Sequence, residues 1–199
     1  MGIVTTNDAQ IRKAFTEALA RYLEKYRENT GRPTKIIQEL GICNGKKRVD
    51  IATINGTLHG YEIKSDLDTL YRLPDQIIEY NKVFDKMTLI VGEKHVIDAL
   101  NMVPEWWGIK IAKINADGVI IFNTIRIDSR NPTQENYAIA RLLWKQEALA
   151  LLSALGNINT HTHNTCKTTY DYLAGAFSRE DLLDVVKSTL LARQGWRVG

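Results

Sequence analysis

Two extended runs of the chain flank Asn55-Gly56, and charged residues are embedded in both runs. The runs cover residues 48–54 and 57–65, and Asn-Gly between two such runs is a strong β-hairpin signal. Asp50 lies in the first run, whereas Glu62 and Lys64 lie in the second. Because side chains two residues apart on a strand point to the same face, Glu62 and Lys64 share a face. Whether Asp50 joins them depends on the register of the hairpin.

Two registers are available, and they place Asp50 differently. A strict two-residue loop pairs Asp50 with Tyr61, which puts Asp50 and Glu62 on opposite faces of the hairpin. One extra residue at the turn, as in a loop with a glycine bulge, pairs Asp50 with Glu62. Only this second register gives one apolar face and one polar face, the apolar face consisting of Val49, Ile51, Tyr61 and Ile63. We therefore predict the bulged register, with Ala52 and Gly60 leaving room on the polar face for a metal ion and a phosphate.

The rest of the chain predicts an α/β core followed by helices. Apolar periodicity and turn residues predict a helix over 9–28, strands over 34–42, 48–54 and 57–65, a helix over 68–84, a strand over 87–92, a short helix over 95–103, and a hairpin of 109–114 and 119–126. Trp106-Trp107 is expected to cap the sheet as a hydrophobic corner. Helices are predicted over 134–155 and 178–193, with a polar loop over 156–165. Residues 1–130 are thus predicted to form an α/β core, a central mixed sheet flanked by helices in the order α-β-β-β-α-β, and residues 131–199 a helical C-terminal extension.

Composition bounds the class of protein without naming a function. The 199 residues suffice for one well-cored domain with an appendage. A net charge of +3 is compatible with a polyanionic partner. No run approaches the roughly 18 apolar residues of a membrane span, and residues 1–12 lack the apolar segment of a signal peptide. Cys43 and Cys166 form no disulfide or zinc framework. We therefore expect a cytoplasmic protein without membrane contact.

The charged residues of the hairpin are the types that metal-dependent phosphodiester hydrolysis requires. Two carboxylates, Asp50 and Glu62, can hold Mg²⁺ through hard oxygen ligands, and Mn²⁺ can substitute. The metal lowers the pKa of a bound water and neutralises developing charge. Lys64 would orient or deprotonate that water or pair with the phosphate; the sequence leaves these roles open. Glu-x-Lys alone is a common surface pattern, but Gln76 and Tyr80 follow at i, i+4 on one face of the next predicted helix.

The order Asp50-x11-Glu62-x-Lys64, followed by Gln76-x3-Tyr80, resembles the PD-(D/E)xK nuclease superfamily. Gln-x3-Tyr is typical of its helicase-associated, RecB-type branch. The string over 60–73, with Trp106-Trp107-Gly108, is similar to an uncharacterised bacterial and phage group of that superfamily. The resemblance covers residues 34–110 and implies a restriction-endonuclease-like core.

The resemblance also implies roles for individual residues. It implies that the catalytic residues are Asp50, Glu62, Lys64, Glu39, Gln76 and Tyr80. Metal ligands would be Asp50, Glu62 and the backbone carbonyl of Ile63. Glu39 is preferred over Glu17 as the supporting acid, because an acid beside Leu40 needs a partner if it faces inward. The proline that the family places before the aspartate is replaced by Val49.

The function expected from these residues is metal-dependent nuclease activity, with DNA favoured over RNA. Arg48 and Arg72 are candidate phosphate contacts, which position a nucleic acid without specifying its sequence. The rival interpretation is a non-catalytic nucleic-acid-binding or adaptor module that retains the nuclease fold. A toxin or a phage or bacterial defence or repair component is a third. The C-terminal helices leave open a homodimer or a protein partner.

Overall fold

The structure, a computed structural model, describes residues 5–155 and 166–195. It contains, in chain order, α1 (Asp8–Thr30), β1 (Lys35–Ile42), β2 (Lys47–Ile54), β3 (Leu58–Lys64), α2 (Leu73–Asn81), β4 (Lys86–Gly92), the 3-10 helix η1 (Glu93–His95), α3 (Val96–Met102), β5 (Gly108–Ile114), β6 (Ile120–Arg126), α4 (Asn136–Ala140), α5 (Lys145–Ala154), α6 (Cys166–Ala176) and α7 (Arg179–Ala192).

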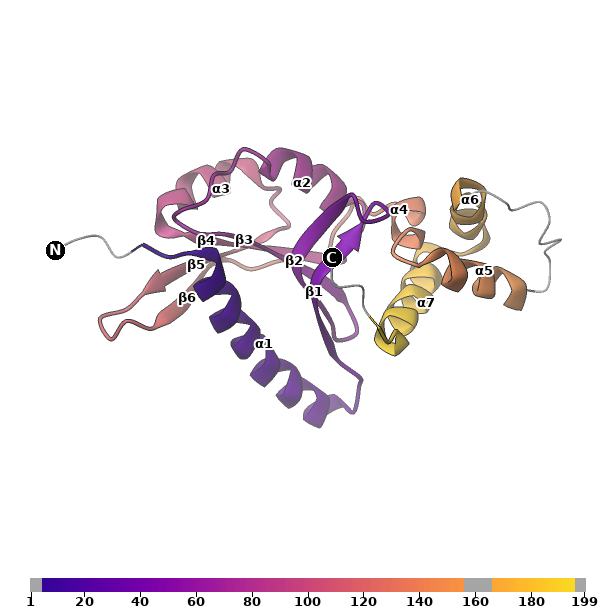
Figure 1. Cartoon of the computed structure of the whole chain (residues 1–199), viewed down its shortest axis with the longest axis horizontal. Coiled ribbons are helices and arrows are strands. Elements are labelled where there is room, and N and C mark those ends of the chain that lie inside the picture. Colours follow the sequence, from indigo (N-terminus) through magenta and orange to yellow (C-terminus); the bar gives the residue numbers. More distant parts are fainter. Residues whose placement is uncertain (1–4, 156–165, 196–199) are drawn as a thin grey trace.

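The six strands form one mixed sheet in the order β1-β2-β3-β4-β5-β6. The pairs β3–β4 and β4–β5 are parallel, and the other three are antiparallel. Helix α1 lies against one face, α2 and α3 lie against the other, and α4–α7 gather beyond the β1–β2 side of the sheet (Figure 1). The predicted α/β class and the α-β-β-β-α-β order of the core are confirmed.

Helix α1 forms where the sequence predicts it and covers one face of the sheet. The side chain of Asn7 caps its first turn by accepting from the N–H of Gln10, and Gly31 ends it with a left-handed φ of 67°. Its buried residues recur every four positions, so they form one stripe: Ile11, Phe15, Leu19 and Leu23. The first three of these residues pack mainly on apolar side chains of β2, β3 and β4, namely Ile51, Tyr61, Ile63 and Ile90.

Helix α2 is shorter than the predicted 68–84 at both ends, because residues 68–72 form bends and a turn and the helix ends at Asn81. Asp68 accepts from the backbone N–H and the hydroxyl of Ser65 at 2.8 and 2.6 Å. This local bond competes with a helical start at Asp68, and the helix begins at Leu73, with Pro74 in its first turn. The ring of His95 also has a hydrogen-bond partner in this segment, because its Nε2 lies 3.0 Å from the backbone oxygen of Asp68.

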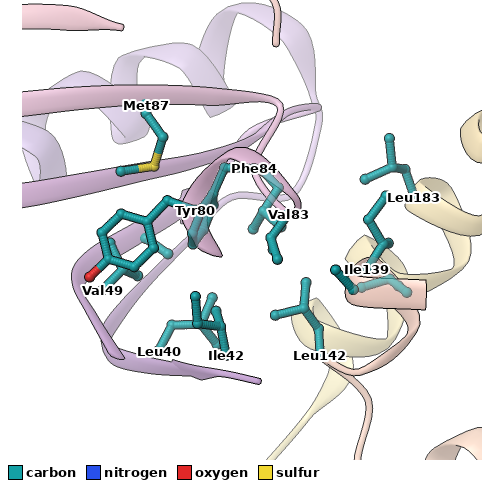
Figure 2. Close-up of a cluster of buried hydrophobic side chains, with 14 of the residues drawn as sticks. Leu40, Ile42, Val49, Tyr80, Val83, Phe84, Met87, Ile139, Leu142 and Leu183 are labelled. Carbon is teal, nitrogen blue, oxygen red and sulfur yellow. The ribbon is translucent and has the colours of Figure 1, made fainter. Parts of the chain in front are cut away.

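The second face of the sheet carries the larger core, which extends into the C-terminal helices. Figure 2 shows Leu40 and Ile42 of β1 lying between Tyr80 of α2 and Leu142 beyond α4, in one continuous cluster. Trp107 is fully buried in this cluster and stacks on Tyr80 with ring centroids 6.2 Å apart. The predicted hydrophobic corner is therefore confirmed.

Hydrogen bonds fix the C-terminal helices to the core at the α2–β4 turn. Asn131 donates through its side chain to the backbone oxygens of Asn81 and Phe84, at 2.7 and 2.8 Å. Gln134 donates to the oxygen of Val83 at 3.0 Å. The sequence allows Leu142, Leu143 and Leu152 to pack either on the core or on another subunit, and in the structure all three are buried inside the chain.

The helix predicted over 134–155 is wrong as a single element, because it divides into α4 and α5. Trp144 has an extended ψ of 154° between them, and its N–H donates to the carboxylate of Glu147 at 2.7 Å. Helix α6 was not predicted, and the loop predicted over 156–165 lies outside the described residues. Ser178 caps α7, accepting from the N–H of Asp181. None of the helices in the described ranges is both long enough and apolar enough to cross a membrane.

Candidate active site

The β2–β3 hairpin has the predicted bulged register. Ile54 pairs with Leu58 and Ile51 with Tyr61, which leaves residues 55–57 as a three-residue loop. Gly56 has a φ of 92°, a conformation that favours glycine. The pairing between the strands stops at Ile51–Tyr61, whereas β2 continues to Lys47 beside β1. The two strands therefore separate at the level of Asp50 and Glu62.

The carboxylate of Asp50 occupies the gap between the separating strands. Its Oδ2 accepts from the backbone N–H of Ile63 at 2.7 Å. Its Oδ1 accepts from Nη2 of Arg12 on α1 at 2.8 Å. The carboxylate of Asp50 thus accepts the N–H of Ile63 in place of a backbone carbonyl of a neighbouring strand. Ile63 reaches the site through its N–H, and a role for its carbonyl as a metal ligand stays a prediction.

Glu62 lies at the centre of a set of polar side chains, and its side chain is 2% exposed. Lys64 donates to Oε1 at 2.6 Å, and Gln76 donates to the same oxygen at 2.6 Å. Tyr80 donates to Oε2 at 2.8 Å and also lies 2.7 Å from the backbone oxygen of Arg48. Helix α2 places Gln76 and Tyr80 one turn apart and facing β3. The structure therefore brings together the Glu-x-Lys and Gln-x3-Tyr residues that the sequence singled out.

Burial controls the electrostatics of this cluster. Burial, together with the nearby charge of Asp50, raises the pKa of Glu62 to about 7, although Lys64 and Tyr80 oppose the shift. Burial and the charge of Glu62 also raise the pKa of the Tyr80 hydroxyl, which stays a donor. Glu62 can consequently gain or lose a proton near neutral pH, a property common at active sites.

Gln76 has one polar atom that the protein leaves unsatisfied. Its Nε2 donates to Glu62 and lies 3.2 Å from the hydroxyl of Tyr80. Its Oε1 is buried and has no hydrogen-bond partner within the described part of the chain. Buried polar atoms of this kind usually have a partner, so Oε1 is available to a water molecule or a bound group.

Glu39 lies opposite Asp50 in the β1–β2 register but faces solvent. Its side chain is 47% exposed, so the expectation of an inward-facing acid is wrong. Its φ of 52° is unusual for a residue with a Cβ. Glu39 reaches the site through Arg12, which donates to Oε1 at 2.9 Å, and it lies 3.6 Å from Nε of Arg48. Glu17, the alternative acid, is exposed on α1.

The apolar face predicted for the hairpin is wrong at Val49. Val49 packs with Leu40 and Tyr80 in the larger core and not beside Ile51 on the α1 face. The unusual conformation of Glu39, opposite Asp50, interrupts the regular alternation of faces in both strands.

The space expected at Gly60 is filled. A Cβ built there would lie 2.4 Å from Sδ of Met87 and 3.1 Å from the ring of Phe84. Ala52 is likewise fully buried in the core. Neither residue leaves room for a metal ion or a phosphate; the accessible side of the site is at Asp50 and Glu39.

Arg12 is the site residue that the sequence did not reveal. It approaches Asp50 from α1, which is 38 positions away in the chain. Asp8 and Arg12 at i, i+4 read as an ordinary helical ion pair, and only the fold shows that the arginine also contacts β1 and β2. Arg48 and Arg72, the predicted phosphate contacts, are both exposed.

The donor set fits a metal ion in part. Among residues 5–155 and 166–195, no three His, Cys, Asp or Glu side chains gather as a set that could hold a metal ion. Asp50 and Glu62 supply two hard carboxylates that are close enough for one charge to shift the pKa of the other. Mg²⁺ commonly takes few protein ligands and completes its octahedron with water and substrate phosphate. The residues fit such an ion on condition that Arg12 releases Oδ1 of Asp50.

These features define a mixed α/β protein with a six-stranded sheet, helices on both faces and a buried carboxylate where two central strands separate. The sequence matches the family described as Bacteriophage P4 protein cII over residues 6–194. The chain belongs to this family.

A curated relative agrees with the family assignment. Protein cII of Enterobacteria phage P4 is 28% identical over 161 residues, which cover 79% of this chain and 59% of that protein. The chain thus spans only part of the length of this curated relative.

Two solved structures are similar at low identity. SPO1766, a protein of unknown function from Silicibacter pomeroyi, aligns with a TM-score of 0.43 and 17% identity over 76% of this chain and 94% of that one. SfsA of Pyrococcus furiosus, solved in complex with Ca²⁺, aligns with a TM-score of 0.36 and 12% identity over 64% of this chain and 68% of that one.

Proposed function

We propose that the chain is a metal-dependent nuclease of the PD-(D/E)xK type that hydrolyses phosphodiester bonds, with DNA favoured as substrate. The observation that supports this proposal most is the assembly around Glu62. Lys64, Gln76 and Tyr80 all donate to its buried carboxylate, and Asp50 lies close enough to raise its pKa. An ion pair that served stability alone would gain little from such burial.

Each side chain has a chemical role in this proposal. Asp50 and Glu62 would hold Mg²⁺, which when bound supplies an activated water and neutralises charge on the phosphate. Gln76 and Tyr80 hold the Glu62 carboxylate in one orientation. Lys64, 2.6 Å from Glu62, can exchange a proton with it or donate to a phosphate oxygen. Arg48 and Arg72 would contact the nucleic-acid backbone from the exposed rim.

A non-catalytic nucleic-acid-binding module is the second candidate, and one observation favours it. All four carboxylate oxygens of Asp50 and Glu62 already accept hydrogen bonds from the protein. A site that needs no metal would be satisfied in this way. The two candidates differ in whether bound nucleic acid is cleaved.

Lys64→Ala is expected to abolish cleavage. Single- and double-stranded DNA and single-stranded RNA are incubated with the wild-type protein and Mg²⁺, with and without a chelator. We expect metal-dependent cleavage by the wild type and at least about a 100-fold loss in the variant, the usual contribution of a proton-transfer group. The matched control is Lys145→Ala, which removes an exposed lysine at the start of α5 and should keep full activity.

Two other results would contradict the proposal. Cleavage that is unchanged in Lys64→Ala would show that Lys64 and the cluster around Glu62 are not the catalytic site. Nucleic-acid binding by a folded wild type without metal-dependent cleavage of any of the three substrates would support the non-catalytic module. Circular dichroism of both variants establishes that a lost activity is not lost folding.

A further inference from the structure

The guanidinium of Arg12 has a protein acceptor for every one of its donors. Nη2 donates to Oδ1 of Asp50 at 2.8 Å and to Asp8 at 3.3 Å. Nη1 donates to Glu39 at 2.9 Å and to the backbone oxygen of Asp50 at 3.0 Å, and Nε donates to Asp8 at 3.2 Å. A guanidinium has five N–H groups, and all five are used. Three carboxylates from α1, β1 and β2 therefore converge on one cation.

This arrangement differs from an ordinary surface ion pair. The side chain of Arg12 is 24% exposed and that of Asp50 is 17% exposed. Burial disfavours the charged guanidinium, but the hydrogen bonds and charges of Asp8 and Asp50 more than offset it, so the pKa of Arg12 is raised. Arg12 therefore holds the position beside Oδ1 of Asp50 that a metal ion bound to this oxygen would need.

We propose that Arg12 occupies the cation position of the acid cluster formed by Asp8, Glu39 and Asp50, and that a divalent metal ion must displace it from Asp50 in order to bind. The inference rests on the proposed nuclease function and adds that Arg12 and the metal ion compete for Asp50. Arg12 and the metal ion would compete for Oδ1 of Asp50, because Oδ2 already accepts from the backbone N–H of Ile63.

The competition also suggests where Arg12 goes. A guanidinium that leaves a carboxylate needs another anion, and a phosphodiester presents two oxygens that match its fork. A substrate phosphate beside Asp50 would supply this anion. The metal would then bind more readily with substrate than without it, and Arg12 would link the two events.

Calorimetric titration of Mn²⁺ into Arg12→Met tests the competition. Methionine keeps much of the apolar stem and removes the charge. Charge-assisted hydrogen bonds of this kind correspond to roughly a 10-fold to 100-fold change in an equilibrium constant. We therefore expect the variant to bind Mn²⁺ at least about 10-fold more tightly than the wild type. Arg12→Lys, which keeps the charge but cannot bridge three carboxylates, should fall between them.

The control separates displacement from a general change in charge. Lys13→Met removes an exposed positive charge from the next position of α1 and is expected to leave the affinity unchanged. Tightening in Lys13→Met equal to that in Arg12→Met would overturn the inference. Unchanged or weaker binding by a folded Arg12→Met would overturn it as well.

The outcomes also distinguish this inference from the proposed function. Wild-type binding that is lost in Asp50→Asn but unaltered in Arg12→Met would leave the nuclease proposal standing and reject the competition. Binding by Arg12→Met alone, abolished by adding Asp50→Asn, would support the competition strongly. If none of the folded variants binds Mn²⁺, the inference fails together with the metal site.

Discussion

Glu62→Gln is expected to abolish metal-dependent cleavage and at the same time make the protein more stable above pH 7. The amide fits the existing hydrogen bonds. Its oxygen can accept from Lys64 and Gln76, and its nitrogen can donate to the hydroxyl of Tyr80, which then donates to the backbone oxygen of Arg48. The variant therefore resembles protonated Glu62, which holds no metal.

The pH dependence of this gain has a definite sign. The folded pKa of Glu62, about 7, is above its ordinary value of 4.5, so its contribution to stability is complete below pH 4.5 and is lost as pH rises through 7. The difference between these pKa values corresponds to roughly 3 kcal/mol. The wild type and Glu62→Gln should thus be equally stable near pH 4, and the variant should be more stable by up to roughly 3 kcal/mol above pH 7.

Urea unfolding of both proteins between pH 4 and 8.5 measures this difference directly. Burial lowers the pKa of His59 to about 4, which gives the wild type an opposing pH dependence, but His59 is present in both proteins and cancels. Glu24→Gln, which removes an exposed carboxylate from α1, should change neither cleavage nor stability by more than about 0.5 kcal/mol. A Glu62→Gln variant that cleaves normally, or one that is no more stable at pH 8 than at pH 4 relative to wild type, would contradict the role given to Glu62.

The largest expected loss of stability comes from Arg193→Ala at the end of α7. The Arg193 side chain is 3% exposed and pairs with Glu147 of α5, donating from Nε at 2.7 Å. It also donates to the backbone oxygen of Leu142 at 2.9 Å and lies over the ring of Trp144 at 4.4 Å. Removing one partner of a buried pair leaves an uncompensated charge, which costs about 3–5 kcal/mol.

An exposed ion pair in the same part of the chain provides the comparison. Arg130 lies 3.5 Å from Glu180, and their side chains are 69% and 79% exposed. Arg130→Ala should therefore cost less than about 1 kcal/mol, as exposed pairs usually do. Urea unfolding at pH 7 measures both variants. Equal losses in the two, or a loss below about 1 kcal/mol for Arg193→Ala, would show that Arg193 does not hold the C-terminal helices to one another.

Local signals in the sequence predicted much of the core. The Asn55-Gly56 turn, with the pattern of charged and apolar residues, predicted a register that the structure confirms through the pairing of Ile51 with Tyr61. The spacing of Gln76 and Tyr80 correctly placed both on the face of α2 that meets Glu62. These features depend on neighbours within a few residues or across one tight turn.

The missed features depend on contacts between distant parts of the chain. The break between α4 and α5 is fixed by Glu147, which binds the N–H of Trp144 and pairs with Arg193. Arg12 enters the site only because α1 crosses the separating strands. The unusual conformation of Glu39 moves Val49 to the other core, and no residue pattern around Glu39 indicates it.

Calorimetric titration of Mn²⁺ into the wild type and into Asp50→Asn measures the proposed metal site at Asp50 and requires no choice of substrate. Asp171→Asn, an exposed aspartate of α6, is the matched control. The metal site at Asp50 predicts binding by the wild type and by Asp171→Asn, and loss of binding in Asp50→Asn. Equal binding by all three proteins would contradict it, and so would the absence of Mn²⁺ binding at millimolar concentration in both the wild type and Arg12→Met.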